Sequence, residues 1–456
     1  MDSVEKFALN SGAHGPSLLW GLAIFGFALI ASFYFFSLDL APTLFFELSL
    51  CAVATVILLL YPEFALALYV VVGDVKGDER IASLGFLDLT LLLGAILLAG
   101  IALNLLHRKR VLPMPPVFFL YIVLAALMTA SLSYTPVFDA GLEKAGRFLT
   151  VTGIVIVAPF FVFDTPGAMK RFLTGYAAAT FAICAYSLTR LGSSGRLVTP
   201  SNFTIGLGHI ACASILLMWL GLMPGLPFAK RLLVYPILAV PVVALIGSGS
   251  RGPLIATALA LLVSLFFYCR FLIDAVCLGV LGFLALPFMR IPEASLSYLG
   301  SLIHSSNAGT LLSFRGELMD SAWKLLEQHP LIGAGIQGYR YYSPNAGLYN
   351  WPHNIFIEIA CELGIPAALI VCAIFGSALR EALRQLKDKL SPYATLSRVA
   401  AALLFVGIVN ATNTGDINSD RSTWLFVSLV FVVRGFRIQP RESANFAAVP
   451  ARPLAV

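Results

Sequence analysis

The sequence predicts an all-α protein, a polytopic transmembrane helical bundle with one long extracytoplasmic loop. The first observation is composition, which is 59% hydrophobic and only 12% charged, whereas soluble domains carry about 25% charged residues. The second is the recurrence of apolar runs of roughly 17–25 residues, the length that crosses a bilayer as a helix. The third is that lysine and arginine gather in the short loops between these runs, as membrane topology requires.

The apolar runs predict 12–14 membrane helices, with 14 as the preferred count. They lie near residues 17–37, 42–60, 62–73, 85–106, 115–133, 139–163, 167–191, 203–222, 231–247, 252–269, 271–289, 354–378, 396–414 and 422–436. The run at 62–73 is too short to span comfortably, so it predicts a tilted or partial helix.

The distribution of basic residues orients the bundle. If the helices alternate, one side holds 18 of the 30 lysines and arginines, and the positive-inside rule makes that side cytoplasmic. Both termini are then expected inside, and no cleavable signal peptide is expected at the polar start. The predicted organisation is helices 1–11 over 1–289, a capping extracytoplasmic loop over 290–353, helices 12–14 over 354–436, and a cytoplasmic tail over 437–456.

The long external loop has structure of its own. Leu311–Gln328 carries apolar residues at helical spacing, which predicts an amphipathic helix, and Trp323 suits an interfacial position. His329-Pro330 ends that helix, and three glycines and several aromatic residues, including Tyr339, follow. We expect this segment to lie on the membrane surface and to cover a site below it, where Tyr339 is a candidate substrate-binding residue.

The stretch from Trp351 to Pro366 is the strongest local signal for chemistry. Pro352 suits the first turn of a helix, so His353 and Asn354 are expected at a helix N-terminus, where free N–H groups favour an anion. Asn354 is therefore a candidate substrate-binding residue. The positive end of the helix dipole also disfavours imidazolium, which keeps a histidine available as a neutral base. Glu362 lies inside the following apolar run, where a carboxylate is costly and marks a functional or ion-paired position, so Glu362 is a further candidate substrate-binding residue.

Three arginines on the predicted external side complete the candidate site: Arg196, Arg251 and Arg315. Guanidinium groups stay charged and match phosphate oxygens with a fork of donors, so their convergence suits pyrophosphate. Each residue also has a structural interpretation. A lone arginine at a membrane edge is usually an anchor, and a histidine at a helix start is more often a cap.

Other polar residues have structural interpretations of equal weight. Glu358 and Glu362 are as readily explained as ion-pair partners of an external arginine, and His209 and Asn202 as interhelical hydrogen-bonding residues. Asp416, Asp420 and Arg421 fit a salt-bridged turn. The seven cysteines lie in apolar segments without metal-ligand spacing, so neither a disulfide nor a metal site is predicted, and no cofactor is expected.

The order of these motifs resembles the O-antigen ligase superfamily, which includes O-antigen polymerases. The resemblance covers about Gly195 to Pro366. The segments that carry it are Gly195-Arg196, Pro200-Ser201-Asn202, Ser248-Gly249-Ser250-Arg251-Gly252, Arg315 to Trp323, His329-Pro330-Leu331-Ile332-Gly333-Ala334-Gly335, His353-Asn354 and Glu362-Leu363-Gly364-Ile365-Pro366. The first part of the chain holds an extra helix or two relative to this pattern.

The resemblance implies a membrane glycosyltransferase of the GT-C class in a bacterial inner membrane. Such proteins pass a glycan from undecaprenyl pyrophosphate to an acceptor hydroxyl on the extracytoplasmic side without a metal. The acceptor is the lipid A core in ligases and another lipid-linked repeat in polymerases. By motif, Arg251 and Arg315 correspond to the pyrophosphate-binding arginines and His353 to the general base, while Arg196 matches an accessory position. Other polysaccharide assembly proteins are expected as further partners, and nucleic acid is not.

Two alternatives stay open at this point. A transporter or flippase of lipid-linked oligosaccharide would also have many helices and pyrophosphate-binding arginines, but it should show broken helices near the midplane and symmetry between halves. Within the enzyme interpretation, ligase, polymerase and ligation to protein are not separated by the sequence.

Overall fold

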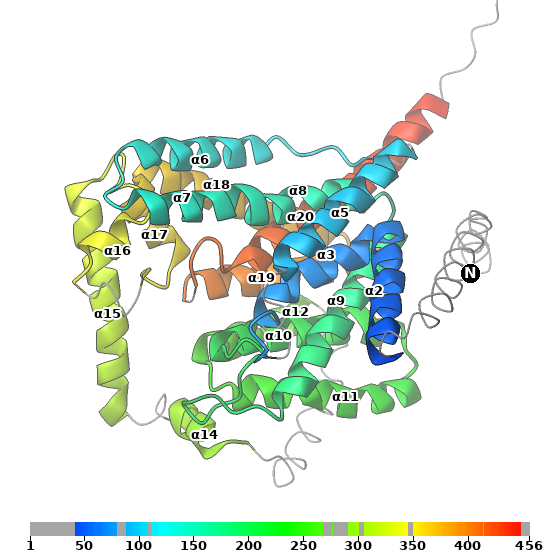
Figure 1. The fold of residues 1–456 in the computed structure, drawn as a ribbon. Coiled ribbons are helices and arrows are strands. Elements are labelled where there is room, and N and C mark those ends of the chain that lie inside the picture. Colours follow the sequence, from blue (N-terminus) through cyan, green and yellow to red (C-terminus); the bar gives the residue numbers. More distant parts are fainter. Residues whose placement is uncertain are drawn as a thin grey trace, which may run out of the picture.

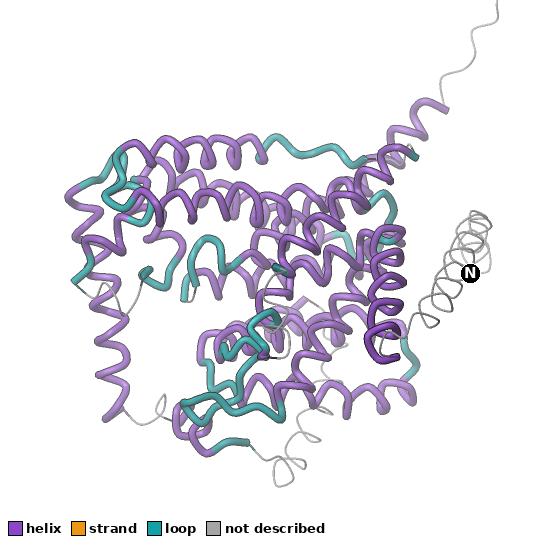
Figure 2. The backbone as a smooth tube through the Cα atoms, in the orientation of Figure 1, coloured by secondary structure: helices purple, strands orange, loops and turns teal. Residues whose placement is uncertain are grey.

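The computed structural model describes residues 42–79, 88–107, 111–267, 276, 291–300, 305–344, 350–413 and 415–447. Within these ranges the regular elements are helices joined by loops, and a single isolated bridge pairs Leu191 with Leu197 (Figure 2). The predicted all-α bundle is therefore confirmed.

The described elements, in chain order, are α2 (Pro42–Leu60), α3 (Pro62–Val71), η1 (Val72–Asp74), α5 (Leu89–Leu106), α6 (Phe118–Ala130), η2 (Ser131–Ser133), α7 (Phe138–Arg147), η3 (Phe148–Thr152), α8 (Gly153–Val162), α9 (Pro166–Ser187), α10 (Thr204–Leu216), η4 (Leu217–Leu222), η5 (Met223–Gly225), α11 (Phe228–Gly247), α12 (Arg251–Phe267), α14 (Glu293–Gly300), α15 (Ser305–Gln328), α16 (Gly338–Tyr342), α17 (Ile355–Leu363), α18 (Ile365–Lys387), α19 (Ala394–Ala411) and α20 (Arg421–Ala447).

Six helices of the described residues are long and apolar enough to cross a membrane, or seven if the bent α2–α3 pair counts as one span. Other predicted helices are present but shorter, such as α12 and α6. The predicted helix at 17–37 and nearly all of the one at 271–289 lie outside the described residues. The chain is thus a multi-pass membrane protein by length and composition, and the total of 12–14 helices stays a prediction.

Two apolar segments are interrupted, one at Tyr61 and the other at Gly364. The α2–α3 pair turns through 111° at Tyr61, which agrees with the prediction of a partial helix over 62–73. The prediction of one continuous helix over 354–378 is wrong, because the chain divides into α17 and α18 at Gly364. Gly364 has φ 87°, a left-handed conformation that glycine adopts without steric cost, and it ends α17 before α18 begins at Ile365 with Pro366 in its first turn.

Helix α15 runs crosswise to the bundle (Figure 1). Helices α6, α7 and α18 extend toward it, and α16 and α17 lie between its upper half and their ends. The C-terminal half of α15 packs on α17 through a small separate cluster that includes Ala322, Leu325 and Cys361. The predicted amphipathic helix over Leu311–Gln328 is confirmed as the larger part of α15, and its position on a membrane surface stays a prediction.

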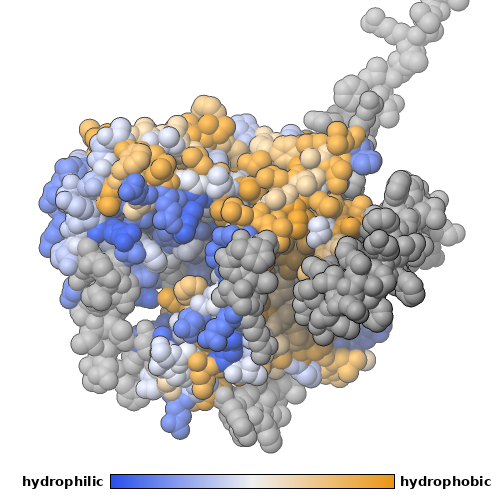
Figure 3. All heavy atoms as spheres, viewed as in Figure 1, coloured by the Kyte–Doolittle hydropathy of each residue, from blue (hydrophilic) through white to orange (hydrophobic). Residues whose placement is uncertain are grey.

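The main core joins the central helices into one apolar cluster. It includes Tyr69 of α3, Phe172 of α9 and Trp424 of α20, each almost fully buried. Apolar residues also cover the outer face over α5 and α3, whereas hydrophilic residues gather toward the end where α16 and α17 lie (Figure 3). This distribution suits a bundle whose sides contact lipid and whose one end is polar.

Candidate active site

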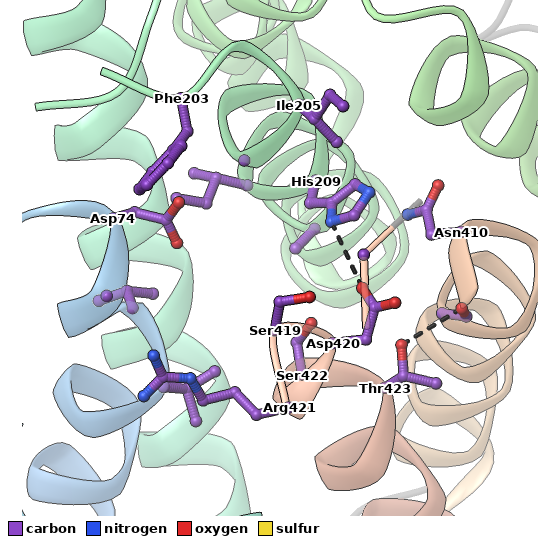
Figure 4. Close-up of a pocket in the computed structure, with 18 of the residues that line it drawn as sticks. Asp74, Phe203, Ile205, His209, Asn410, Ser419, Asp420, Arg421, Ser422 and Thr423 are labelled. Atoms are coloured by element: carbon purple, nitrogen blue, oxygen red, sulfur yellow. Dashed lines mark hydrogen bonds and ion pairs between the residues drawn. The ribbon is translucent and has the colours of Figure 1, made fainter. Parts of the chain in front are cut away.

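A cavity of about 450 Å³ opens among α3, α9, α10, α19, α20 and the loop before α17 (Figure 4). Its walls are largely apolar, with a small number of polar groups, which is the usual character of a small-molecule site. The polar side chains that line it are Asp74, Tyr176, Asn202, Thr204, His209, Trp351, His353, Asn410, Ser419, Asp420, Arg421, Ser422 and Thr423.

His353 reaches this cavity from a constrained loop. Its backbone has φ 57°, an uncommon conformation for a residue other than glycine, and its ring lies 5.9 Å from that of Trp351 between centroids. Asn354 then caps α17, because its side-chain oxygen accepts hydrogen bonds from the backbone N–H groups of Phe356 and Ile357 at 3.0 and 3.2 Å.

The cap also joins two elements. The Asn354 side-chain amide donates to the Thr412 carbonyl oxygen at 3.1 Å, which ties the start of α17 to the end of α19. The structure therefore gives Asn354 a defined structural task beside His353, and its predicted contact with substrate stays a prediction.

The electrostatic surroundings favour a neutral His353. Burial lowers the pKa of His353 below its ordinary value of 6.5, and the positive charge of Arg315 lowers it further, while Asp416 opposes both. Because Arg315 acts on the pKa of His353, the structure brings these two predicted residues into electrostatic range. Arg315 itself is exposed on α15.

Arg251 and Arg196 are linked through the short loop before α12. Arg251 opens α12, and the hydroxyl of the preceding Ser250 donates to the carbonyl oxygen of Thr204, a cavity residue, at 3.1 Å. Gly249 has φ 63°, and the Arg196 side chain packs where a Cβ on Gly249 would stand. None of the three predicted arginines is among the described residues that line the cavity, and the bond from Ser250 to Thr204 links the start of α12 to its wall.

Glu362 is held in a buried ion-pair cluster. Its carboxylate lies 2.6 Å from the Lys144 ammonium, which also lies 2.5 Å from a carboxylate oxygen of Glu358. The three side chains are at most 4% exposed. The expected partner of the two glutamates, an external arginine, is therefore corrected to Lys144 of α7. A lysine inside the predicted helix 139–163 was the sequence signal, because an intramembrane charge is costly and usually paired.

The same region explains why two of the motifs occur together. The loop after α15 donates backbone hydrogen bonds to the end of α17, from Ala334 to the Cys361 carbonyl and from Gly335 to the Glu362 carbonyl, both at 2.9 Å. In return, Ile365 donates to the Pro330 carbonyl at 2.9 Å. The segments 329–335 and 361–366, which carry these two motifs, are thus joined by backbone hydrogen bonds in both directions. We call this contact the interlocked joint.

Tyr339 belongs to this joint rather than to the cavity wall. Its side chain is fully buried, and its hydroxyl donates to the Leu318 carbonyl of α15 at 3.2 Å. Tyr339, a residue of α16, therefore packs against α15. Its predicted role in substrate binding stays a prediction.

Apart from His353, the described residues of the cavity wall were not predicted as site residues, and those with charged or imidazole side chains are Asp74, His209, Asp420 and Arg421. His209 Nδ1 lies 3.9 Å from an oxygen of Asp420. Arg421 reaches away from Asp420, beneath Asp74 and against Gly73 (Figure 4). The sequence showed Asp420 and Arg421 as neighbours in one turn. It did not show that Asp74 of η1 and His209 of α10 line the same cavity.

Comparison with known proteins agrees with the motifs. Residues 236–372 match the family model described as O-antigen ligase, which confirms the resemblance to the O-antigen ligase superfamily. The matched range holds Arg251, Arg315, His353 and Glu362, and it ends before Arg421. No curated protein matches the sequence.

Proposed function

We propose that this protein is an inverting glycosyltransferase that works without a metal on the extracytoplasmic face of the bacterial inner membrane. It transfers a glycan from an undecaprenyl-pyrophosphate-linked donor to an acceptor hydroxyl, as an O-antigen ligase or a repeat-unit polymerase. The observation that carries the proposal is that His353 lines the cavity, where burial and the charge of Arg315 favour its neutral form. Both residues lie within the O-antigen ligase match.

The chemistry is a direct displacement at the anomeric carbon of the donor sugar. The acceptor oxygen forms its bond to this carbon while His353 takes the hydroxyl proton. The bond from the anomeric carbon to the pyrophosphate oxygen breaks, and its electron pair leaves with the undecaprenyl pyrophosphate. Attack opposite to the leaving group inverts the linkage, and no covalent intermediate with the protein forms.

The arginines have the complementary task. Negative charge grows on the pyrophosphate as it leaves, and Arg251 and Arg315 stabilise this charge from α12 and α15. The Arg196 side chain packs against Gly249, two residues before Arg251, and so helps to hold the start of α12 in place. Lys144 and the two glutamates hold α17 in place, and so keep His353 at the cavity.

Single substitutions test this assignment. We expect Arg251→Ala to abolish transfer, Arg315→Ala to leave only a residual rate, and His353→Ala to lower the rate roughly 10²–10⁴-fold, the usual worth of a positioned base. Arg340→Ala is the matched control, because Arg340 is an exposed arginine of the same external segment. Transfer is measured in membrane vesicles with lipid-linked donor, and folding by size-exclusion in detergent. Normal glycan products from folded Arg251→Ala or Arg315→Ala protein would refute the proposal.

Deletion of the gene separates the two kinds of acceptor. Loss of long chains with single repeats still attached identifies a polymerase. Loss of all attached glycan, with lipid-linked polymer accumulating, identifies a ligase. An unchanged glycan profile in the deletion strain would count against both.

A further inference from the structure

The cavity carries polar atoms that the proposed chemistry does not use. Among the described residues, Trp351 Nε1, Asp420 Oδ2 and Arg421 Nη1 are buried without a hydrogen-bond partner. Asp420 is only 2% exposed, and all three residues line the cavity. Unpaired buried polar atoms cost free energy. Because the residues that carry them also line the cavity, a ligand with both hydrogen-bond donors and acceptors suits its wall.

We propose that this cavity is a binding site for a neutral sugar ring, and that the ring belongs to the acceptor. The inference rests on the proposed function and extends it, because it assigns Arg421, Asp420 and Trp351 to acceptor recognition.

The charges at the site favour a neutral ligand. Among the described residues of the cavity wall, Asp74 and Asp420 carry carboxyl groups and Arg421 alone carries a guanidinium. An anion would meet these carboxyl groups at close range, whereas hydroxyl groups both donate to carboxylates and accept from guanidinium and indole N–H groups. A hydroxylated ring therefore satisfies the donors and the acceptor together.

The remaining wall suits the apolar face of a sugar. Tyr176, Phe203 and Phe426 contribute aromatic rings, and Ile205 and Val406 contribute aliphatic surface. The volume of about 450 Å³ falls within the range of about 300–1,000 Å³ for small-ligand sites. Apolar walls with few polar groups orient a ring by its hydroxyls while covering its C–H faces.

The position of His353 assigns the ring to the acceptor. A general base must lie within hydrogen-bond reach of the hydroxyl whose proton it takes, and His353 lines this cavity. The arginines assigned to the donor pyrophosphate, Arg251 and Arg315, are not among the described residues that line it. The cavity thus lies on the side of the base, and the leaving group lies on the side of the arginines.

Binding is tested first with the full chain in lipid nanodiscs and a panel of methyl glycosides of neutral hexoses and N-acetylhexosamines. Saturation-transfer NMR should detect a bound glycoside, and Arg421→Met should weaken its binding at least tenfold. Ser422→Leu, which fills the cavity without removing a charged group, should do the same. Arg190→Met is the control, because Arg190 pairs with Asp78 outside the cavity. This variant should bind the glycoside as tightly as the unaltered protein does.

Unchanged glycoside binding in folded Arg421→Met and Ser422→Leu proteins would overturn the site. Tighter binding of inorganic phosphate than of any glycoside would also overturn it.

Transfer then separates the acceptor from the donor. The glycoside that binds best is offered as acceptor with lipid-linked glycan from the source cells as donor, and the product is followed by mass spectrometry. Arg421→Met should raise the KM for the glycoside about tenfold more than the KM for the donor. A larger rise in the donor KM would overturn the assignment to the acceptor. If the unaltered protein binds glycosides at this site but neither transfers nor hydrolyses the donor, the sugar site stands and the proposed transferase function fails.

Discussion

At the scale of single residues, the environment of His353 determines what it can do. The loop conformation at φ 57° turns the residue toward the cavity, and the Asn354 cap fixes the helix that follows. Burial and the Arg315 charge both disfavour imidazolium. A histidine kept neutral beside a cation is suited to accept a proton near neutral pH.

The pH dependence of transfer follows from these influences. Only neutral His353 can accept the proton, so kcat/KM should fall as the pH drops through a pKa that is lower than the ordinary 6.5. Arg315→Gln removes a positive charge that lowers this pKa, so the acid limb of its residual activity should move to higher pH. The profile is measured from about pH 4.5 to 8.5, the range in which a perturbed histidine titrates.

The matched control for this profile is Lys324→Gln. Lys324 is an exposed cation of the same helix α15, and it pairs with Asp320. Its acid limb should coincide with that of the unaltered protein. An acid limb in Arg315→Gln that does not move would mean that Arg315 lies too far from His353 to act on it.

At the scale of elements, the joint between the α15–α16 loop and the end of α17 holds the external segment to the bundle. Gly333 is central to it, with φ 68° and no room for a Cβ, which would overlap the Glu362 backbone. Backbone hydrogen bonds across the joint continue from Ala334 and Gly335. Small residues at these positions are therefore needed for close backbone approach.

Gly333→Ala should destabilise the protein by about 1–3 kcal/mol or more, because alanine is strained at positive φ and the neighbouring backbone cannot yield. Gly316→Ala is the matched control within α15. No atom lies within 4 Å of its added Cβ, so the change should be neutral or stabilising by roughly 0.5–1 kcal/mol. Thermal unfolding in detergent compares the two, and equal melting temperatures would contradict the interlocked joint.

The Lys144 cluster joins α7 to α17 by charge. Removing the cation in Lys144→Met leaves two buried carboxylates without compensation, which should destabilise the protein by about 3–5 kcal/mol. Changing Glu358 and Glu362 to glutamine as well removes the unpaired charges, so this triple variant should recover most of the loss in thermal stability. A single Lys144→Met protein as stable as the unaltered one would show that the cluster does not hold α17.

At the scale of the whole molecule, the crosswise helix α15 and the polar end of the bundle define one face (Figures 1 and 3). Arg315, His353 and the interlocked joint all lie on segments of this end. The loop between α18 and α19 belongs to a different connection, and its flanking basic residues predict that this connection is cytoplasmic.

Cysteine labelling in intact cells tests this orientation. Leu331→Cys lies in the loop after α15 and Leu390→Cys in the loop after α18, and the native side chains are 71% and 97% exposed. A membrane-impermeant maleimide should label Leu331→Cys in intact cells and Leu390→Cys only after permeabilisation. The protein with its native cysteines alone gives the background. The reverse pattern would place the candidate site in the cytoplasm and contradict the proposed topology.

The sequence by itself determined the all-α membrane architecture, the helix in the external loop and the helix start at Asn354, because hydropathy, helical periodicity and capping are local properties. It also singled out Arg251, Arg315 and His353 by motif order. Only the tertiary structure decided which side chains meet: Lys144 with Glu362, 218 residues away, Tyr339 against α15, and Arg421 beneath Asp74 in the cavity wall. These contacts depend on how helices that are distant in sequence pack against one another. A local sequence pattern can show that a buried charge needs a partner, but it cannot identify that partner.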